Sequence, residues 1–278
     1  MDSFKREFKR YKQRQPPPDL SEVIDFTQPE AVPFKKWNGV FYGIHGHPGF
    51  VFIVNPFNPG AQWQWVEKCI KDYPCQPNIC NLDAHVDRTG TDTIWNQSMS
   101  DESSCLEKSL LYKLRWVTLG YHYDWDSKTY SKTRHTEFPP DLGKLIEFIA
   151  TALQFPRLTA ISLILSALKP EAAIINYYHL DSTLSGHTDH SELDLTAPLF
   201  SLSFGQSAIF LLGGKTREQA PLAMYLRSGD IMIMAVNSRL AYHAVPRILA
   251  PPKHASEAAL PACLLRGEVD TKGDCIEK

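Results

Sequence analysis

Short apolar runs fill the second half of the chain, at residues 172–180, 199–214, 220–235 and 240–248. They are rich in β-branched and aromatic residues, and Gly, Asn, Asp and Ser separate them. β-Branched and aromatic residues favour strands, whereas Gly, Asn, Asp and Ser favour turns. Strands that follow one another with no helix between them are typical of an antiparallel sandwich or barrel.

The first half of the chain has a different pattern. Apolar residues recur at helical spacing in residues 59–73 and 141–155, and Asp141 is a candidate N-cap of the second helix. Residues 49–57 indicate a buried strand that ends at Asn-Pro, and residues 113–125 indicate a strand followed by an aromatic loop. A helical front half and a β-rich back half predict an α+β protein built on a double-stranded β-helix (jelly roll), with N-terminal helical elements.

The beginning of the chain is basic. Residues 4–14 place Phe4, Phe8 and Tyr11 at near-helical spacing among lysines and arginines, and a proline-rich break follows. Three interpretations stay open for this helix: an arm that binds nucleic acid, part of a mitochondrial targeting sequence, or a helix with a solvated polar face.

Charge and cysteine content narrow the class of protein. The 278 residues carry a formal net charge of −2, so any contact with nucleic acid must come from a local basic patch. The six cysteines include no Cys-x-x-Cys pair, which predicts free thiols in a reducing compartment. No apolar run is long enough to span a bilayer, and the start lacks the apolar core of a secretory signal. We therefore expect a monomer that is neither secreted nor in the membrane, located in the nucleus, the mitochondrion or the cytoplasm.

Candidate metal ligands lie in the β-rich second half of the chain. His187 and Asp189 form a His-x-Asp pair, and side chains two positions apart in an extended segment point the same way. A second histidine, His243, lies in a later run. Two imidazoles and one carboxylate on one face of a metal form the facial triad of non-haem iron(II) oxygenases, which leaves the other face open.

The sequence around these ligands resembles the AlkB family of iron(II)- and 2-oxoglutarate-dependent dioxygenases. The resemblance is strongest in residues 175–194, 198–214 and 227–248, and it extends over most of the chain. It implies a jelly-roll fold, Fe(II) as cofactor, and 2-oxoglutarate and O2 as co-substrates. It implies that the iron ligands are His187, Asp189 and His243. It implies that 2-oxoglutarate contacts Asn176, Tyr177 and Tyr178. It implies that the substrate contacts Trp95, Tyr121, His122, Tyr123 and Arg217.

The same resemblance implies an enzyme that demethylates or hydroxylates methylated bases in nucleic acid, in tRNA and also in DNA. The base must be flipped or unpaired to reach a buried iron, and rings such as those of Tyr121 and Tyr123 would stack on it. Two other hypotheses stay open: an impaired form that only binds nucleic acid or protein, and a dioxygenase that acts on a protein side chain such as a methylated histone lysine. The basic first helix and the aromatic residues 121–125 favour nucleic acid.

Several of these residues also have an ordinary structural explanation. Tyr121 and Tyr123 could be core aromatics, and Arg217 could be a solvated loop charge. Asn176 could cap the end of a strand.

The C-terminal part departs from the AlkB pattern. The family ends its jelly roll with a strand of pattern Arg-x-Asn-x-Thr-x-Arg, whose first arginine binds the far carboxylate of 2-oxoglutarate. Residues 261–278 contain one arginine, Arg266, and no such strand, so we expect the last strand to be missing and activity to be weakened. Residues 157–169 resemble an insertion. The expected organisation is a basic helix and linker at 1–35, an AlkB-like dioxygenase domain at 36–260, and an atypical tail beyond it.

Overall fold

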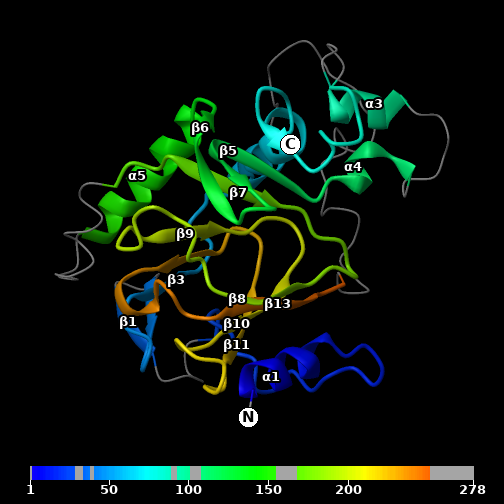
Figure 1. Ribbon diagram of the computed structural model, residues 1–278. Coiled ribbons are helices and arrows are strands. Elements are labelled where there is room, and N and C mark those ends of the chain that lie inside the picture. Colours follow the sequence, from blue (N-terminus) through cyan, green and yellow to red (C-terminus); the bar gives the residue numbers. More distant parts are fainter. Residues whose placement is uncertain are drawn as a thin grey trace.

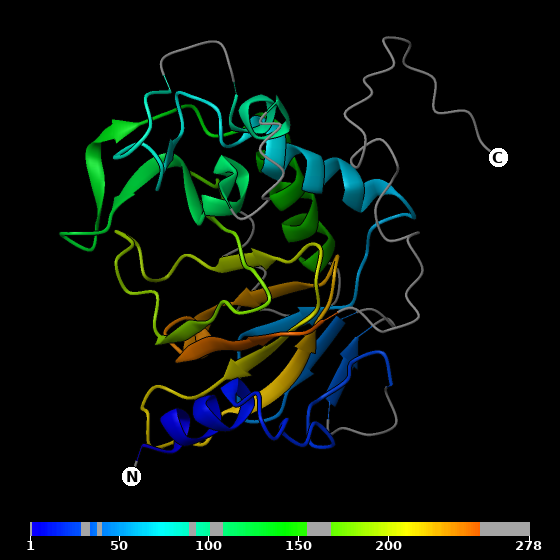
Figure 2. The same ribbon diagram turned by 90° about the vertical axis from the view of Figure 1, so that its right-hand side faces the viewer.

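The computed structural model describes residues 2–28, 34–37, 41–88, 93–100, 108–154 and 168–250. Two sheets lie face to face, and a third sheet with most of the helices lies to one side of them (Figures 1 and 2). The predicted insertion at 157–169 falls largely outside the described residues, and the predicted tail falls entirely outside them.

The first sheet has five antiparallel strands in the order β1-β2-β3-β12-β9. They are β1 (Phe34–Trp37), β2 (Phe41–Ile44), β3 (Phe50–Ile53), β12 (Ile231–Met234) and β9 (Leu199–Leu202). Three of the five come from the first half of the chain. The buried strand predicted at 49–57 is confirmed as β3, whereas β1 and β2 were not predicted and add strands to the front half. The sequence also did not reveal that β3 pairs with the distant β12.

The second sheet has four antiparallel strands in the order β11-β10-β13-β8. They are β11 (Leu222–Leu226), β10 (Ala208–Leu212), β13 (His243–Ile248) and β8 (Leu184–His187). Each lies in or beside a run that the sequence predicts to be extended, and the predicted antiparallel arrangement is confirmed.

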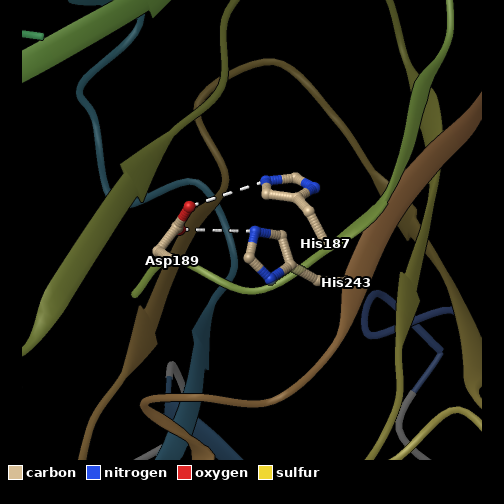
Figure 3. Close-up of side chains that lie close together, drawn as sticks. All are labelled: His187, Asp189 and His243. Atoms are coloured by element: carbon tan, nitrogen blue, oxygen red, sulfur yellow. Dashed lines mark ion pairs between the residues drawn. The ribbon is translucent and has the colours of Figure 1, made fainter. Parts of the chain in front are cut away.

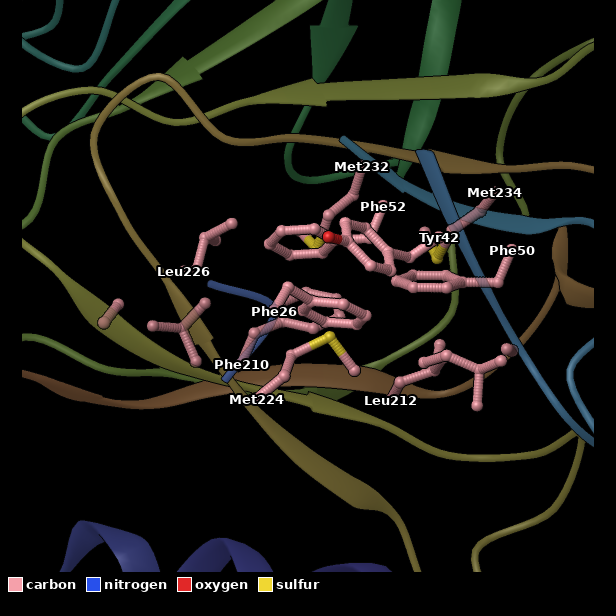
Figure 4. Close-up of a cluster of buried hydrophobic side chains, with 14 of the residues drawn as sticks. Phe26, Tyr42, Phe50, Phe52, Phe210, Leu212, Met224, Leu226, Met232 and Met234 are labelled. Carbon is pink, nitrogen blue, oxygen red and sulfur yellow. The ribbon is translucent and has the colours of Figure 1, made fainter. Parts of the chain in front are cut away.

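Side chains alternate between the two faces of β3 and β12. Phe52 faces the second sheet and belongs to the main core, where Phe26 stacks on it with ring centroids 4.0 Å apart (Figure 4). Val51 and Ile233 face the other way and pack on the helix α5 (Pro140–Gln154). Both faces of these strands are therefore buried, which explains why they read as continuous apolar runs.

The helices predicted at 59–73 and 141–155 are confirmed. The first is α2 (Ala61–Glu67), which continues into the π-helical turn η2 (Lys68–Asp72). The second, α5, begins at Pro140, so Asp141 lies in its first turn and is not the N-cap. Proline suits the first helical position because the amide hydrogen that it lacks would have no partner there.

The N-terminal helix α1 (Ser3–Lys12) packs on the outer face of the second sheet (Figure 1). Phe4 and Tyr11 are 0% and 3% exposed, and they contact Ile209 and Leu211 of β10 in one apolar cluster. The apolar face of α1 is therefore part of the core of the protein. The interpretation as a helix with a solvated polar face fits this packing, and a free arm does not.

The third sheet is formed by β4 (Ile79–Cys80), β5 (Trp116–Asp124), β6 (Thr129–His135) and β7 (Ala172–Asn176). Most of the aromatic run that the sequence predicts as a loop lies within β5, because β6 and β7 pair with opposite edges of this strand. The short helices α3 (Ile94–Ser100) and α4 (Leu110–Lys113) lie beyond this sheet (Figure 1). The three cysteines in the described part of the chain are free, as predicted. Among the described residues, no helix combines the length and the apolar character needed to cross a membrane.

Candidate active site

Three side chains converge where β8 ends and β13 begins (Figure 3). His187 is the last residue of β8 and His243 is the first of β13, and the two are direct partners in the antiparallel register. The carboxylate oxygens of Asp189 lie 3.5 Å from His187 Nε2 and 3.4 Å from His243 Nε2. One ligand atom from each residue lies within 4.8 Å of the other two, as a common metal ion requires. The predicted triad therefore meets in space.

A backbone carbonyl orients each imidazole. His187 Nδ1 lies 2.8 Å from the carbonyl oxygen of Ser185, and His243 Nδ1 lies 3.1 Å from that of Ala241. A carbonyl oxygen only accepts hydrogen bonds, so Nδ1 carries the proton and Nε2 keeps its lone pair on the side of Asp189. Two neutral imidazoles and one carboxylate, held this way, fit iron(II).

The surroundings of His187 and Asp189 favour the protonation states that bind metal. Burial, followed by the charge of His243, lowers the pKa of His187. Burial opposes the ionisation of Asp189, but the neighbouring groups His243, His187 and Arg239 outweigh it and lower the pKa of this carboxyl. A neutral imidazole and an ionised carboxylate are the forms that ligate a metal.

A wall of aromatic rings from the hairpin of β5 and β6 adjoins the loop that carries Asp189. The Tyr123 hydroxyl lies 3.5 Å from Ser191 Oγ in that loop. The Tyr123 ring meets Trp125 and Tyr130 edge-on, with centroids 4.9 and 5.2 Å apart. Burial and the charges of Glu192 and Asp189, which both belong to the adjoining loop, raise the pKa of Tyr130.

Comparison with known proteins agrees with this geometry. A family model described as the 2OG-Fe(II) oxygenase superfamily matches residues 49–267. The nucleic acid dioxygenase ALKBH1 of Homo sapiens is 46% identical over 95% of this chain and 76% of its own length. The chain belongs to the AlkB family of 2OG-Fe(II) oxygenases. The resemblance inferred from sequence is thus confirmed, and the chain is a 2-oxoglutarate-dependent dioxygenase.

Two further relatives extend the comparison with AlkB proteins. The tRNA demethylase abh1 of Schizosaccharomyces pombe is 34% identical over 88% of this chain and 85% of its own length. The solved structure of OsALKBH1 superposes with a TM-score of 0.50 at 19% identity, and the match covers 82% of this chain and 92% of that one. The superposition supports the jelly-roll fold.

The residues that the AlkB resemblance assigns to 2-oxoglutarate take different positions. Tyr178 packs against the main core, and burial together with the charge of Asp189 raises its pKa to about 12. Tyr177 belongs instead to an apolar cluster of the third sheet, and its hydroxyl donates to the Cys69 carbonyl. Asn176 ends β7 and is exposed. Tyr178 is therefore buried in the main core, where the charge of Asp189 acts on it, whereas the position of Tyr177 gives its predicted role no support.

The AlkB resemblance predicts three substrate-binding residues on β5, and they lie in different surroundings. Tyr123 belongs to the aromatic wall. Tyr121 packs on the ring of His135, with centroids 5.1 Å apart. His122 is buried, and its Nδ1 lies 2.9 Å from Thr118 Oγ1. Tyr121 and His122 therefore contribute to the packing of the third sheet.

The other two residues predicted to bind substrate, Trp95 and Arg217, lie on other elements than β5. Trp95 is in α3, in the helical layer beyond the third sheet, with Lys71 Nζ 5.0 Å from its ring centroid (Figure 1). Arg217 Nε lies 3.5 Å from Asp2 Oδ2, and its guanidinium lies 5.7 Å from the Tyr242 ring centroid. These positions place Trp95 among the helices and Arg217 at the start of α1.

Sequence analysis did not single out Tyr130 or Arg239, which both lie close to Asp189. Tyr130 could have been found from the sequence, because it pairs with Tyr123 directly across the β5–β6 hairpin. Arg239 could not, because its hydrogen-bond partners are far away in sequence.

Proposed function

We propose that this chain oxidatively removes or hydroxylates methyl groups on bases in nucleic acid, with tRNA as the main substrate and DNA as a further one. The observation that carries the proposal is the aromatic wall of Tyr123, Trp125 and Tyr130 beside the loop of Asp189. An unpaired base can stack on the face of an aromatic ring whatever the identity of the base. The names of two relatives, a nucleic acid dioxygenase and a tRNA demethylase, agree with it.

In this proposal each group has a defined task. His187, Asp189 and His243 hold iron(II), and the AlkB resemblance assigns Tyr178 to 2-oxoglutarate. When bound, iron(II) with 2-oxoglutarate and O2 supplies the oxidation of the methyl group. A hydroxylated N-methyl group is lost as formaldehyde, whereas a hydroxylated C-methyl group stays on the base. The aromatic wall positions the flipped base and excludes water from it.

The β5–β6 hairpin also supplies positive charge for the nucleic acid backbone. Lys128, Lys132 and Arg134 are exposed on it. They lie on the element that carries Tyr123 and Tyr130, so phosphates flanking a stacked base would lie within their reach. A local patch of this kind resolves the apparent conflict between a polyanionic substrate and a net charge of −2.

The test compares ring variants on one methylated substrate. Tyr123→Ala and Tyr130→Ala should each weaken binding of a methylated single-stranded RNA by about 1–3 kcal/mol, the free energy of one stacked base. Fluorescence anisotropy measures the binding, and formaldehyde release measures turnover. Tyr112→Ala is the matched control, because Tyr112 stacks on His179 instead.

The outcomes separate the alternatives. Formaldehyde release that needs 2-oxoglutarate, stops in Asp189→Ala and falls in both ring variants supports the proposal. Release only from a methyl-lysine peptide would replace it with a protein demethylase. Binding of RNA without any turnover would leave a nucleic-acid-binding module.

We also propose an oligomeric state and a location for the enzyme. We expect it to act as a monomer in the nucleus, mitochondrion or cytoplasm. Sedimentation of the purified chain and fractionation of cells test these two points.

A further inference from the structure

Arg239 is a buried cation at the end of the 3-10 turn η4 (Val236–Ser238), four residues before the ligand His243. It is 2% exposed, and all three guanidinium nitrogens have acceptors. Nη1 donates to the Asp189 carbonyl over 2.6 Å, and Nε donates to the Ala197 carbonyl over 2.7 Å. Nη2 donates to Glu192 Oε2 over 3.0 Å. Arg239 thus joins the segment that leads to one metal ligand to the backbone of another.

The loop that Arg239 holds has little structure of its own. It connects β8 to β9, and residues 188–198 form neither helix nor strand. Leu193 in the middle of it is 77% exposed. Asp189 lies at one end of this loop, and the loop residues that contact Arg239 span its length from Asp189 to Ala197. Without such a tie, the Asp189 carboxylate would have more freedom than two histidines fixed in paired strands.

We propose that Arg239 is a positioning residue that sets the place of the Asp189 carboxylate before the metal binds. Its planar guanidinium reaches three acceptors in three directions at once, which the single ammonium of a lysine cannot reproduce. Groups that orient metal ligands in this way typically contribute 10–100-fold to metal affinity. The inference concerns the ligand set alone, and it holds for any substrate.

Glu192 neutralises the positive charge of Arg239. An unpaired cation beside a metal site would repel the metal ion. The ion pair with Glu192 neutralises Arg239 without using the side chain of Asp189, whose oxygens stay directed to the two imidazoles. The pair also satisfies a buried charge that would otherwise be costly to leave without a partner.

The test measures binding of Co(II) alone to the full chain, by calorimetry and by the visible absorption of the bound ion. Arg239→Lys should bind Co(II) about 10–100-fold more weakly and shift its absorption bands, because the carboxylate ligand is misplaced. The matched control is Arg227→Lys. Arg227 is also an ion-paired arginine, which binds the Asp25 carboxylate through two bonds of 2.9 and 2.7 Å, and none of its bonds reaches the triad. It should bind Co(II) within about twofold of the unmodified chain.

A second variant keeps the test decisive if Arg239→Lys does not fold. Glu192→Asp retains the negative charge but shortens its reach, so one of the three ties to Arg239 is lost. It should weaken Co(II) binding about threefold or more while the metal-free melting temperature stays near that of Arg227→Lys. A purely structural role for Arg239 would lower the melting temperature and leave Co(II) affinity and absorption unchanged. Affinities equal to that of Arg227→Lys in every folded variant would overturn the proposal.

Discussion

The imidazole of His122 is 4% exposed inside the third sheet, where it contacts Thr118. Burial, followed by the charge of Arg134, lowers its pKa. The unfolded chain takes up a proton on this group near pH 6.5, whereas the folded chain resists it. The stabilising effect is therefore complete above about pH 6.5 and is lost as pH falls below that value.

This sign gives a prediction for thermal unfolding. The melting temperature should fall as pH decreases from 7.5 to 5.5, and His122→Gln should reduce the steepness of that fall while preserving a hydrogen bond to Thr118. Calorimetry at several pH values measures the slope. His85→Gln, a change at an exposed position, is the control. Equal slopes for the two variants would mean that burial of His122 does not govern the acid response.

At the residue scale, the sequence predicted best where chemistry restricts the residue type. A metal accepts few kinds of ligand, so His187, Asp189 and His243 could be identified before the fold was known. Tyrosine and arginine serve both packing and binding, and type alone does not separate the two uses. The AlkB resemblance predicts binding roles for Tyr177 and Arg217, and in the folded chain Tyr177 packs in an apolar cluster while Arg217 pairs with Asp2 at the start of α1.

At the scale of elements, α1 supports the strands that carry both histidine ligands. The Phe4 ring lies in a notch formed by Gly186 of β8 and Gly213, where a Cβ atom would come within 2.6 and 2.7 Å of the ring. Gly186 directly precedes the ligand His187, and α1 also packs along β13. A side chain larger than hydrogen at either glycine would push α1 away from the sheet.

Removal of the Phe4 ring should therefore destabilise the fold strongly. Phe4→Ala should lower the free energy of unfolding by about 3–5 kcal/mol, as for other fully buried phenylalanines. Phe8→Ala, on the same helix but only partly buried, should cost clearly less. Urea unfolding followed by circular dichroism measures both. A loss for Phe4→Ala no larger than that for Phe8→Ala would show that α1 is held mainly by polar contacts.

The burial pattern of each element decides whether the sequence could predict it. Periodicity identified α2, α5 and the later strands, because one buried stripe or two buried faces mark each of them. It did not reveal that β1 to β3 join the five-stranded sheet, or that the aromatic run belongs to β5, since strand partners lie far apart in the chain. Because one face of α1 is part of the core, deleting this helix would disturb the fold. A role of its basic residues in binding nucleic acid must therefore be tested by charge substitution.

At the scale of the whole molecule, 2-oxoglutarate needs groups at both of its ends. The triad can hold one end through iron, and the AlkB resemblance places an arginine of a final strand at the other. Arg247 is a nearby cation on β13, but its Nη1 donates to the Gln13 carbonyl over 2.7 Å and so points toward the end of α1. Arg239 is occupied by the loop after Asp189. Arg247 and Arg239 are therefore both held by other groups and are not placed to bind the far carboxylate.

We therefore predict that this sequence binds iron(II) normally but 2-oxoglutarate weakly. A buried carboxylate that lacks its charged, bidentate partner loses about 2–5 kcal/mol, which weakens binding by roughly tens- to thousands-fold. A chain whose residues after 260 are replaced by a strand with the Arg-x-Asn-x-Thr-x-Arg pattern should regain that affinity, whereas Arg247→Ala should leave it nearly unchanged. Succinate release measured against 2-oxoglutarate concentration, at matched iron occupancy, gives the half-saturating concentration for each chain. If the original and the strand-bearing chain saturate at the same concentration, a cation outside the family pattern must bind the co-substrate, and Arg266→Ala would then be the first variant to measure, because Arg266 is the single arginine of the altered tail.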